Sequence, residues 1–236
     1  MRGRLVRREA LTEAERDAMY GLLAGAFAGV TRERFAADLA EKTWALLLEG
    51  ESGLQGFSTL LLYETDLLGE GVCTVVYSGD TIVDPAAWGS AALPRCWINA
   101  VRRLREAYPR GRLWWLLLTS GFRTYRFLPV FWRDFSPRWD VLMPPEARAR
   151  LDFLAAERLG DLYSRDQGIV RFPQPQRLRG ELARVPEGRL EDPHVAFFLA
   201  RNPGWREGDE LACLTEISEA NLTAAGRRMW RGGGLE

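Results

Sequence analysis

Apolar residues recur at helical spacing near the start of the chain. Thr12 and Glu15 have the spacing of a capping box, which marks where a helix begins. Behind them, five apolar residues follow the one-face pattern of an amphipathic helix: Met19, Leu22, Leu23, Ala26 and Phe27. A short second helix is expected from Thr31, with Phe35 turned inward. The first part of the chain is therefore predicted to be helical.

Three strand-like runs follow, separated by glycines. They are Thr43 to Leu48, Leu54 to Glu64 and Gly71 to Val83. The glycines that interrupt them are expected at turns or bulges: Gly53, Gly69 and Gly79. Because the connections are short, we expect the three runs to pair as an antiparallel meander.

The most regular helical stripe lies in the middle of the chain: Leu93, Cys96, Trp97, Ala100, Val101, Leu104 and Tyr108. Ser90 can cap the start of this helix, and Pro109 with Gly111 ends it. The run Leu113 to Thr119 is apolar throughout, as expected of a central strand covered on both faces. The segment Val83 to Thr119 is thus a strand–helix–strand unit whose two strands should be parallel.

The rest of the chain mixes helix, strand and loop signals. Phe122 to Phe135 is rich in aromatic residues and is expected to be helical. Pro137 to Val185 is interpreted as an insertion that holds one helix and a Pro- and Arg-rich loop or covering arm. Val195 to Ala200 and Glu210 to Ile217 are predicted as two strands that form a closing hairpin.

Composition narrows the classes of function. The 236 residues include 32 basic and 32 acidic side chains, a balance that argues against a general nucleic-acid binder. All of the basic residues except Lys42 are arginines. The one histidine, His194, excludes multi-histidine metal sites, and we expect no metal. His194 itself is more typical of a structural or surface residue.

Cysteine usage and the absence of long apolar windows bear on location. Cys73, Cys96 and Cys213 lie far apart and are odd in number, which favours a reducing compartment. The N-terminus lacks the apolar stretch of a signal peptide, and no window approaches the ~20 apolar residues of a membrane span. We therefore expect a cytoplasmic protein with no membrane span.

The order of the expected elements resembles one known family. A strand near Leu5 is followed by two helices, three meander strands, a long helix, a strand, a helix and a hairpin. This order is similar to that of the GNAT acyltransferase superfamily over roughly Leu5 to Ile217. The resemblance implies an α/β fold in which helices flank a central mixed sheet of about six or seven strands. It also implies a single domain over residues 1–236, with residues 137–185 inserted before the last two strands.

The most specific local match is the stretch from Val83-Asp84-Pro85 to Leu93, which looks like the family's fourth strand and donor loop. In the family this loop reads Arg/Gln-x-x-Gly-x-Gly/Ala, and its amides hold the pyrophosphate of acyl-coenzyme A (acyl-CoA). Here Trp88 stands where Arg or Gln is expected. The resemblance implies a donor site made of Ile82, Val83, Trp88, Gly89, Ser90 and Ala91. An acyl carrier protein, with a single phosphate, is a second possible donor.

The resemblance also implies where proton transfer occurs. In GNAT transferases an amine attacks the thioester directly, a base takes a proton and an acid protonates the leaving thiolate. Tyr125, just past the fifth strand, lies near the family's acid, and Asp80, on the fourth strand, lies near its base. Tyr125 also belongs to a run of packing aromatics. Asp80 follows Gly79 and can equally be a bulge carboxylate.

Together these features predict an N-acyltransferase. It would move an acyl group from acyl-CoA, or from an acyl carrier protein, to an amine of a small molecule or peptide. The alternative is a catalytically degenerate GNAT-like module that binds a ligand or partner, which the divergent loop favours. The nine Trp and eleven Phe could line a pocket for a longer acyl chain, although core packing explains most of them.

Overall fold

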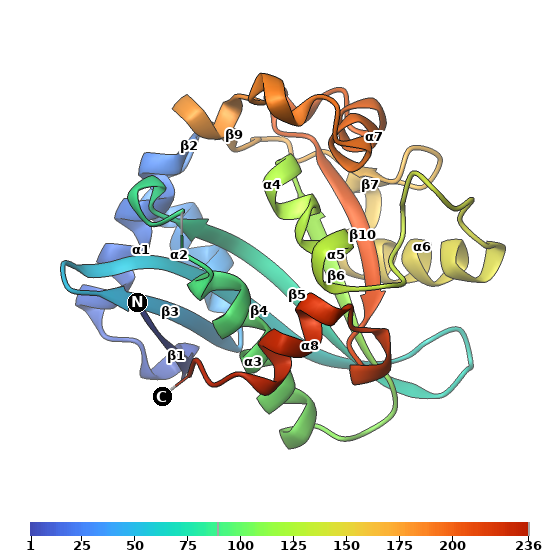
Figure 1. Cartoon of the computed structure of the whole chain (residues 1–236), viewed down its shortest axis with the longest axis horizontal. Coiled ribbons are helices and arrows are strands. Elements are labelled where there is room, and N and C mark those ends of the chain that lie inside the picture. Colours follow the sequence, from blue (N-terminus) through green and yellow to red (C-terminus); the bar gives the residue numbers. More distant parts are fainter. Residues whose placement is uncertain (89, 236) are drawn as a thin grey trace.

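An eight-stranded mixed sheet runs through the molecule in the order β1-β3-β4-β5-β6-β10-β8-β7 (Figure 1). The computed structural model describes residues 1–88 and 90–235. Six strands form the body of the sheet: β1 (Arg2–Arg7), β3 (Trp44–Gly50), β4 (Gly53–Asp66), β5 (Val72–Val83), β6 (Leu113–Thr119) and β10 (Glu210–Glu216). The remaining two, β7 (Tyr163–Ser164) and β8 (Ile169–Val170), come from the insertion and raise the expected count of six or seven.

The meander and the parallel pair are confirmed. β3, β4 and β5 pair antiparallel, as their short connections require. β5 and β6 pair parallel, and α3 (Ala92–Ala107) makes the crossover between them. Gly111, in the turn that leads into β6, has φ +59°, and a Cβ there would lie 2.0 Å from the Val72 carbonyl oxygen. Only glycine fits this turn.

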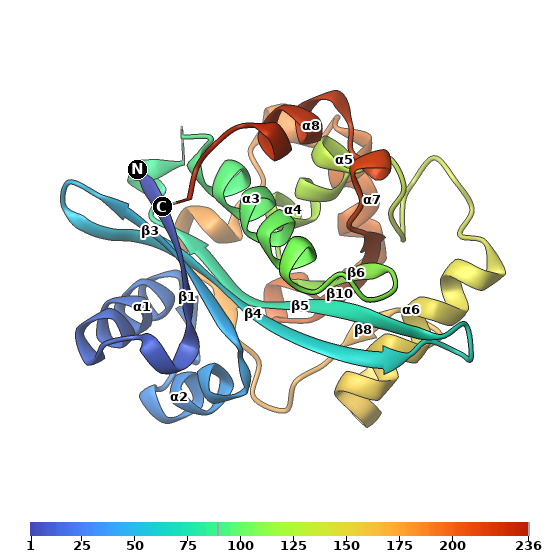
Figure 2. The same cartoon turned by 90° about the horizontal axis from the view of Figure 1, so that it is seen from below.

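Helices cover both faces of the sheet (Figure 2). One face carries α1 (Glu13–Ala26), α2 (Arg32–Glu41) and α6 (Pro145–Leu159). The other carries α3, α4 (Phe122–Tyr125), α5 (Phe127–Phe131), α7 (Pro193–Arg201) and α8 (Ala224–Arg231). The capping box is present, since the Thr12 hydroxyl accepts from Glu15 N and the Glu15 carboxylate accepts from Thr12 N.

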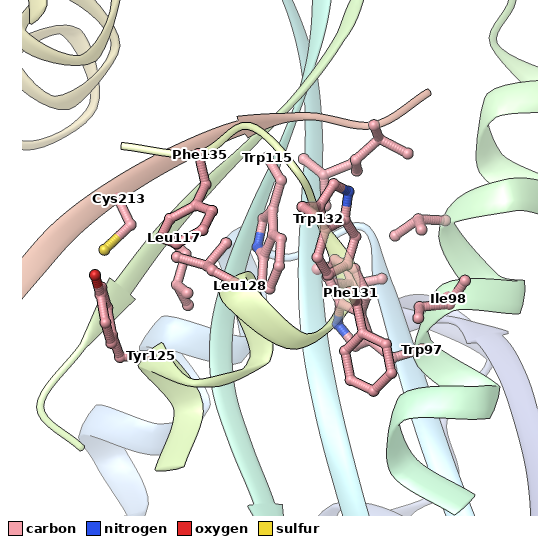
Figure 3. Packing of buried hydrophobic residues seen from close by; sticks show 14 of the residues in the cluster. Trp97, Ile98, Trp115, Leu117, Tyr125, Leu128, Phe131, Trp132, Phe135 and Cys213 are labelled. Carbon is pink, nitrogen blue, oxygen red and sulfur yellow. The ribbon is translucent and has the colours of Figure 1, made fainter. Parts of the chain in front are cut away.

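Aromatic rings fill the space between β6 and the helices above it (Figure 3). The rings of Trp97 on α3 and Trp115 on β6 have centroids 4.2 Å apart, and Trp132 lies 5.0 Å from Trp115. β6 is buried along its whole length, so successive residues alternate between two cores. Trp115 and Leu117 face this aromatic core, whereas Trp114, Leu116 and Leu118 face α6.

The predicted closing hairpin is wrong in its first half. Residues 195–200 belong to helix α7, and β10 alone pairs with β6. A short, continuous apolar run fits a buried strand and a buried helix equally well. The deciding signal is local: Asp192 accepts from His194 N at 3.0 Å as the N-cap, and Pro193 takes the first helical position.

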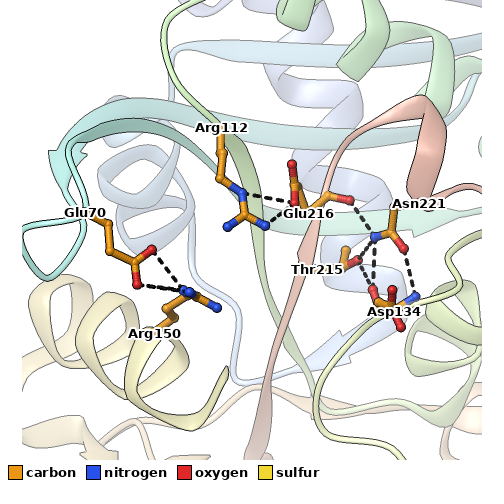
Figure 4. Close-up of polar contacts among 7 residues, drawn as sticks. All are labelled: Glu70, Arg112, Asp134, Arg150, Thr215, Glu216 and Asn221. Carbon is orange, nitrogen blue, oxygen red and sulfur yellow. Dashed lines mark hydrogen bonds and ion pairs between the residues drawn. The ribbon is translucent and has the colours of Figure 1, made fainter. Parts of the chain in front are cut away.

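The insertion reaches back across the molecule. After α6, β7 and β8, residues 172–185 form a segment called the arm below. Its strand β9 (Arg177–Leu178) pairs with β2 (Phe27–Ala28). Arg150 of α6 holds Glu70 in the β4–β5 turn (Figure 4). Polar contacts also secure the C-terminal segment, because the Asn221 amide donates to the carbonyls of Asp134 and Glu216 and to Thr215 Oγ1.

Across residues 1–88 and 90–235, no helix is both long enough and apolar enough to cross a membrane.

Candidate active site

The parallel strands β5 and β6 separate at their C-terminal ends. Their pairing runs from Thr74–Leu113 to Ser78–Leu117 and ends there, while β5 continues to Val83 (Figure 1). A bulge accompanies the separation: Ser58 pairs with Thr81 and Leu60 with Ser78, so that Thr59 faces both Gly79 and Asp80. Bulges bend a strand and redirect side chains. The bulge alternative for Asp80 is therefore confirmed, and it does not remove Asp80 from the cleft.

Two cavities meet at this separation. The polar cavity has a volume of about 380 Å³ and lies between α2, the ends of β5 and β10, and the arm. The aromatic cavity has a volume of about 700 Å³ and lies between α3, α4, α5 and the arm. Residues of both strands, α4 and the arm line both: Ser78, Thr81, Ile82, Leu117, Arg123, Thr124 and Leu182. The gap between the strands thus joins one cavity to the other.

Carboxyl groups line the polar cavity. Asp80 comes from β5, Glu210 from the start of β10, and Asp38 and Glu41 from α2. Burial raises the pKa of Asp80 to about 7, with a further upward contribution from Asp38 and an opposing one from Lys42. Burial also raises the pKa of Glu210 to about 8, and Asp80 and Asp38 add to the shift. A carboxyl that titrates near neutral pH is suited to general-base work.

Apolar side chains dominate the aromatic cavity. Trp97, Trp115, Phe122, Phe127 and Phe131 form its walls, with Ile82 and Val83 of β5 at its edge. The Trp115 indole donates to Ser78 Oγ at 2.9 Å. Because the Ser78 oxygen accepts this bond, its own hydrogen is left to point toward another acceptor. This cavity can hold the apolar part of an elongated ligand whose end reaches the gap.

The strand order decides the fold: a β1-β3-β4-β5 meander, a parallel β5–α3–β6 crossover, separated strand ends and an antiparallel β10 beside β6. This is the strand order that the resemblance to the GNAT superfamily implies. The sequence matches no family model and no curated protein.

Solved structures similar to the chain include GNAT proteins. One is the GNAT-family N-acetyltransferase YhbS from Escherichia coli in complex with CoA: 17% identity, TM-score 0.40, covering 54% of this chain and 68% of that chain. Another is the ribosomal-protein-S18-alanine N-acetyltransferase from Escherichia coli, with 15% identity and a TM-score of 0.42. The match covers 58% of this chain and 79% of that chain. A probable N-acyltransferase from Enterococcus faecalis is 14% identical with TM-score 0.42 over 53% of this chain, which spans 31% of that protein.

The GNAT-like donor loop is only partly as expected. Ile82, Val83, Trp88 and Ser90 line the aromatic cavity, and Ala91 does not. Gly89 lies outside the described residues. Ser90 Oγ accepts from Ala92 N, but the N-cap of α3 is Ala91, so Ser90 lies one residue before the expected capping position. Five amides near the start of α3 donate to acceptors within the loop, and so are not free for a phosphate: Ala86, Ala87, Trp88, Ser90 and Ala92.

Trp88 replaces the family's polar residue with a fixed aromatic ring. Its indole donates to the Val83 carbonyl at 3.0 Å. The Arg123 guanidinium lies 4.8 Å from the Trp88 ring centroid and 4.6 Å from that of Phe122. Arg123 also donates to the carbonyls of Glu181 and Leu182, so it connects the loop, α4 and the arm. The loop is therefore held in place by side chains.

Tyr125 does not lie where the expected acid would have to be. It is fully buried, lines neither cavity, and packs against Phe135, Phe197 and Phe198 (Figure 3). Its hydroxyl donates to the Pro137 carbonyl at 2.9 Å, and burial raises its pKa far above the ordinary value. This geometry corrects the expected role of Tyr125: it is the packing residue of the alternative interpretation.

Sequence reasoning missed Glu210 and Thr124. Glu210 was visible only as the first residue of an apolar strand, and its position beside Asp80 depends on the pairing of β10 with β6. Thr124 sits at the gap because α4 follows β6 directly. The Asp192–Arg126 ion pair, at 2.8 Å, further connects α4 to α7.

Proposed function

We propose that the chain is an acyltransferase that binds an acyl thioester in the aromatic cavity and an amine in the polar cavity. The observation that carries this proposal is the meeting of the two cavities at the separated ends of β5 and β6, with Asp80 on the polar side. A thioester carbonyl at the gap and an amine beside Asp80 would lie next to each other. Such placement is the main requirement of direct transfer.

The proposed reaction needs one proton acceptor. Asp80 takes one proton from the ammonium group of the acceptor, and the lone pair that this frees attacks the thioester carbonyl carbon. The tetrahedral intermediate collapses with cleavage of the carbon–sulfur bond, and its nitrogen still carries one proton more than the neutral amide. Ser78, Thr81 and Thr124 carry the hydroxyls that line both cavities, and the Thr81 hydroxyl lies 2.7 Å from Ser58 Oγ. A hydrogen bond from Ser78 or Thr124 stabilises the departing sulfur. The departing thiolate takes the extra proton from the nitrogen through water, which gives a neutral amide and a free thiol.

We propose a small-molecule amine as the acceptor. The polar cavity holds about 380 Å³ and is covered by arm residues, including Phe172, Gln174 and Leu178. A folded protein cannot enter a cavity of this size, whereas a small amine can. A peptide N-terminus is the second candidate, since a flexible end can follow the same path.

The donor is proposed to be acyl-CoA. The carriers of positive charge around the aromatic cavity are Arg123, Arg126 and Arg189, and Arg189 is exposed. Arginines can contact phosphate where the paired loop amides cannot. The same paired amides favour a carrier-protein donor over a tightly held pyrophosphate. They also favour the second candidate function, a GNAT-like binding module without catalysis.

A panel assay distinguishes these candidates. Purified protein is incubated with acetyl-CoA, a longer acyl-CoA or an acyl carrier protein, each with small amines and with a short peptide, and free thiol is measured. We expect amine-dependent thiol release with acyl-CoA and amide product of the matching mass. Donor binding by calorimetry without turnover on any amine would favour the binding module. Release only from the carrier protein would correct the donor.

A further inference from the structure

The single lysine of the chain lies beside the polar cavity. Lys42 follows α2 and is 2% exposed, in a sequence whose other basic residues are arginines. Its Nζ donates to Asp38 Oδ1 at 2.6 Å and to the Asp38 carbonyl at 3.2 Å. A buried ammonium is costly unless paired, and Asp38 provides the pairing carboxylate.

Lys42 extends to the bulge that carries Asp80. A Cβ at Gly79 would lie 2.5 Å from Lys42 Cε and 2.6 Å from Thr59 Oγ1. The lysine stem thus occupies the space that any side chain at position 79 would need. Gly79 leaves room for this stem, and the next residue along the chain is Asp80. A compact ammonium fits here, whereas the wider guanidinium of arginine needs more room and more acceptors.

We propose that Lys42 is a positioning residue of the acceptor cavity: its buried ammonium fixes Asp38 and supplies the positive charge that keeps Asp80 an effective proton acceptor. This inference rests on the proposed function, because it assigns Lys42 a role through Asp80. It goes beyond that function by naming the residue that sets the working pH of the site.

The charged and titratable groups around Asp80 come from four elements. α2 contributes Asp38 and Glu41 and is followed by Lys42, β5 contributes Tyr77, β10 contributes Glu210, and α6 contributes Arg158. Arg158 pairs with Glu41 and lies 5.2 Å from the Tyr77 ring centroid, and Lys42 Nζ lies 5.6 Å from the same ring. Arg34 and Arg123 also line the cavity, each donating to backbone carbonyls. Burial and Asp38 raise the pKa of Asp80, and of the two cations beside the Tyr77 ring it is Lys42 that lowers this pKa.

The test replaces Lys42 by a neutral side chain of similar length. In Lys42→Met the pKa of Asp80 should rise above about 7. The acid limb of kcat/KM against pH should then move up by about one unit or more, so that kcat/KM at pH 6 falls about tenfold or more. Above the new limb, kcat/KM should stay within about twofold of the parent value. The double variant Asp38→Asn/Lys42→Met should recover part of the shift, since it also removes the carboxylate that opposes ionisation of Asp80.

Arg158→Met is the matched control, because it removes the other cation on the Tyr77 ring and should leave the limb in place. The carboxyl ¹³C resonance of Asp80, assigned by its loss in Asp80→Asn, reports the same titration without substrate. A folded Lys42→Met protein in which the Asp80 resonance gives the same pKa as in the parent overturns the proposal. So does an equal loss of kcat/KM at every pH, which would indicate a purely structural role. If the pKa of Asp80 reported by the resonance rises in Lys42→Met and no donor or acceptor reacts, the proposed function fails and the coupling of Lys42 to Asp80 stands.

Discussion

The two cavities that meet at the β5–β6 gap are built in opposite ways. The polar cavity presents carboxyl groups from three separate elements, two of them with pKa values raised toward neutrality. The aromatic cavity presents rings that also pack the core, and its charged residues include the exposed Glu181 and Arg189. The carboxyls with raised pKa values therefore line one cavity, and an apolar ligand is favoured in the other.

This difference explains which substitutions should matter most. A change at a titrating carboxyl alters the chemistry directly, whereas a change at the aromatic side alters binding or packing. The two kinds of effect are separable by measuring kcat, donor affinity and stability for the same variant.

Removal of the proposed base should have the largest effect. Asp80→Asn is expected to lower kcat/KM by about 10²- to 10⁴-fold, the usual contribution of a general base. Glu64→Gln, an exposed carboxylate of β4, is the matched control and should leave the rate unchanged. A raised carboxyl pKa means that ionised Asp80 opposes folding. Asp80→Asn should therefore melt at a higher temperature than the parent at pH 8.5, with the difference shrinking as the pH falls from about 7 to about 4. A rate like that of the parent would contradict the role of Asp80.

The pH dependence of the parent protein is the next largest effect. Asp80 must be ionised to accept a proton, and burial raises its pKa to about 7. Log kcat/KM should rise with a slope near one from pH 5 to about 7 and then level off, a change of about 100-fold. Measuring kcat/KM at a series of pH values, in buffers of constant ionic strength, tests this profile. A flat profile between pH 5 and 7 would mean that the base lies elsewhere.

A smaller effect is expected at the rim of the aromatic cavity. Arg189→Ala should weaken acyl-CoA binding by about two- to fivefold, because one exposed ionic contact contributes up to about 1 kcal/mol. The loss should disappear at high salt. Calorimetric titration at two salt concentrations checks this, with Arg110→Ala, an exposed arginine outside both cavities, as the control. Equal affinities at low salt would place the donor's phosphates away from Arg189.

Tyr125→Phe should have the smallest effect on activity. The hydroxyl bonds the Pro137 carbonyl in the core, so its loss should cost about 1 kcal/mol of unfolding free energy and leave kcat within about twofold. Urea unfolding and the thiol-release assay measure both on one sample. A large loss of kcat with unchanged stability would restore Tyr125 as the acid.

The sequence was sufficient for the regular half of the fold. The meander and the β5–α3–β6 crossover follow from long periodic runs and short connections. Gly79 marked the bulge, and Asp80 lies on β5, the expected fourth strand of the meander and crossover. These features depend on residues close together in the chain.

The irregular half could not be predicted from spacing. Residues 195–200 fit strand and helix equally well, and only the Asp192–Pro193 start decides for α7. Glu210 reaches Asp80 through pairing between β10 and β6, some ninety residues apart. The donor loop's own hydrogen bonds form around the turn at Pro85–Ala87, where Asp84 accepts from Ala86 N just as Asp192 accepts from His194 N at α7. Long-range pairing determines the position of Glu210.

The account's central claim is that one reaction passes through the gap shared by the two cavities. Thr124 lines both cavities, so a larger side chain at this position would block the gap between them. The most direct test measures kcat and acyl-CoA affinity for Thr124→Trp, with Thr124→Val as the control of equal size. The account predicts that Thr124→Trp binds acyl-CoA within about tenfold of the parent but transfers about 100-fold more slowly or worse, because donor and acceptor no longer meet. Transfer at the parent rate by Thr124→Trp would contradict the claim.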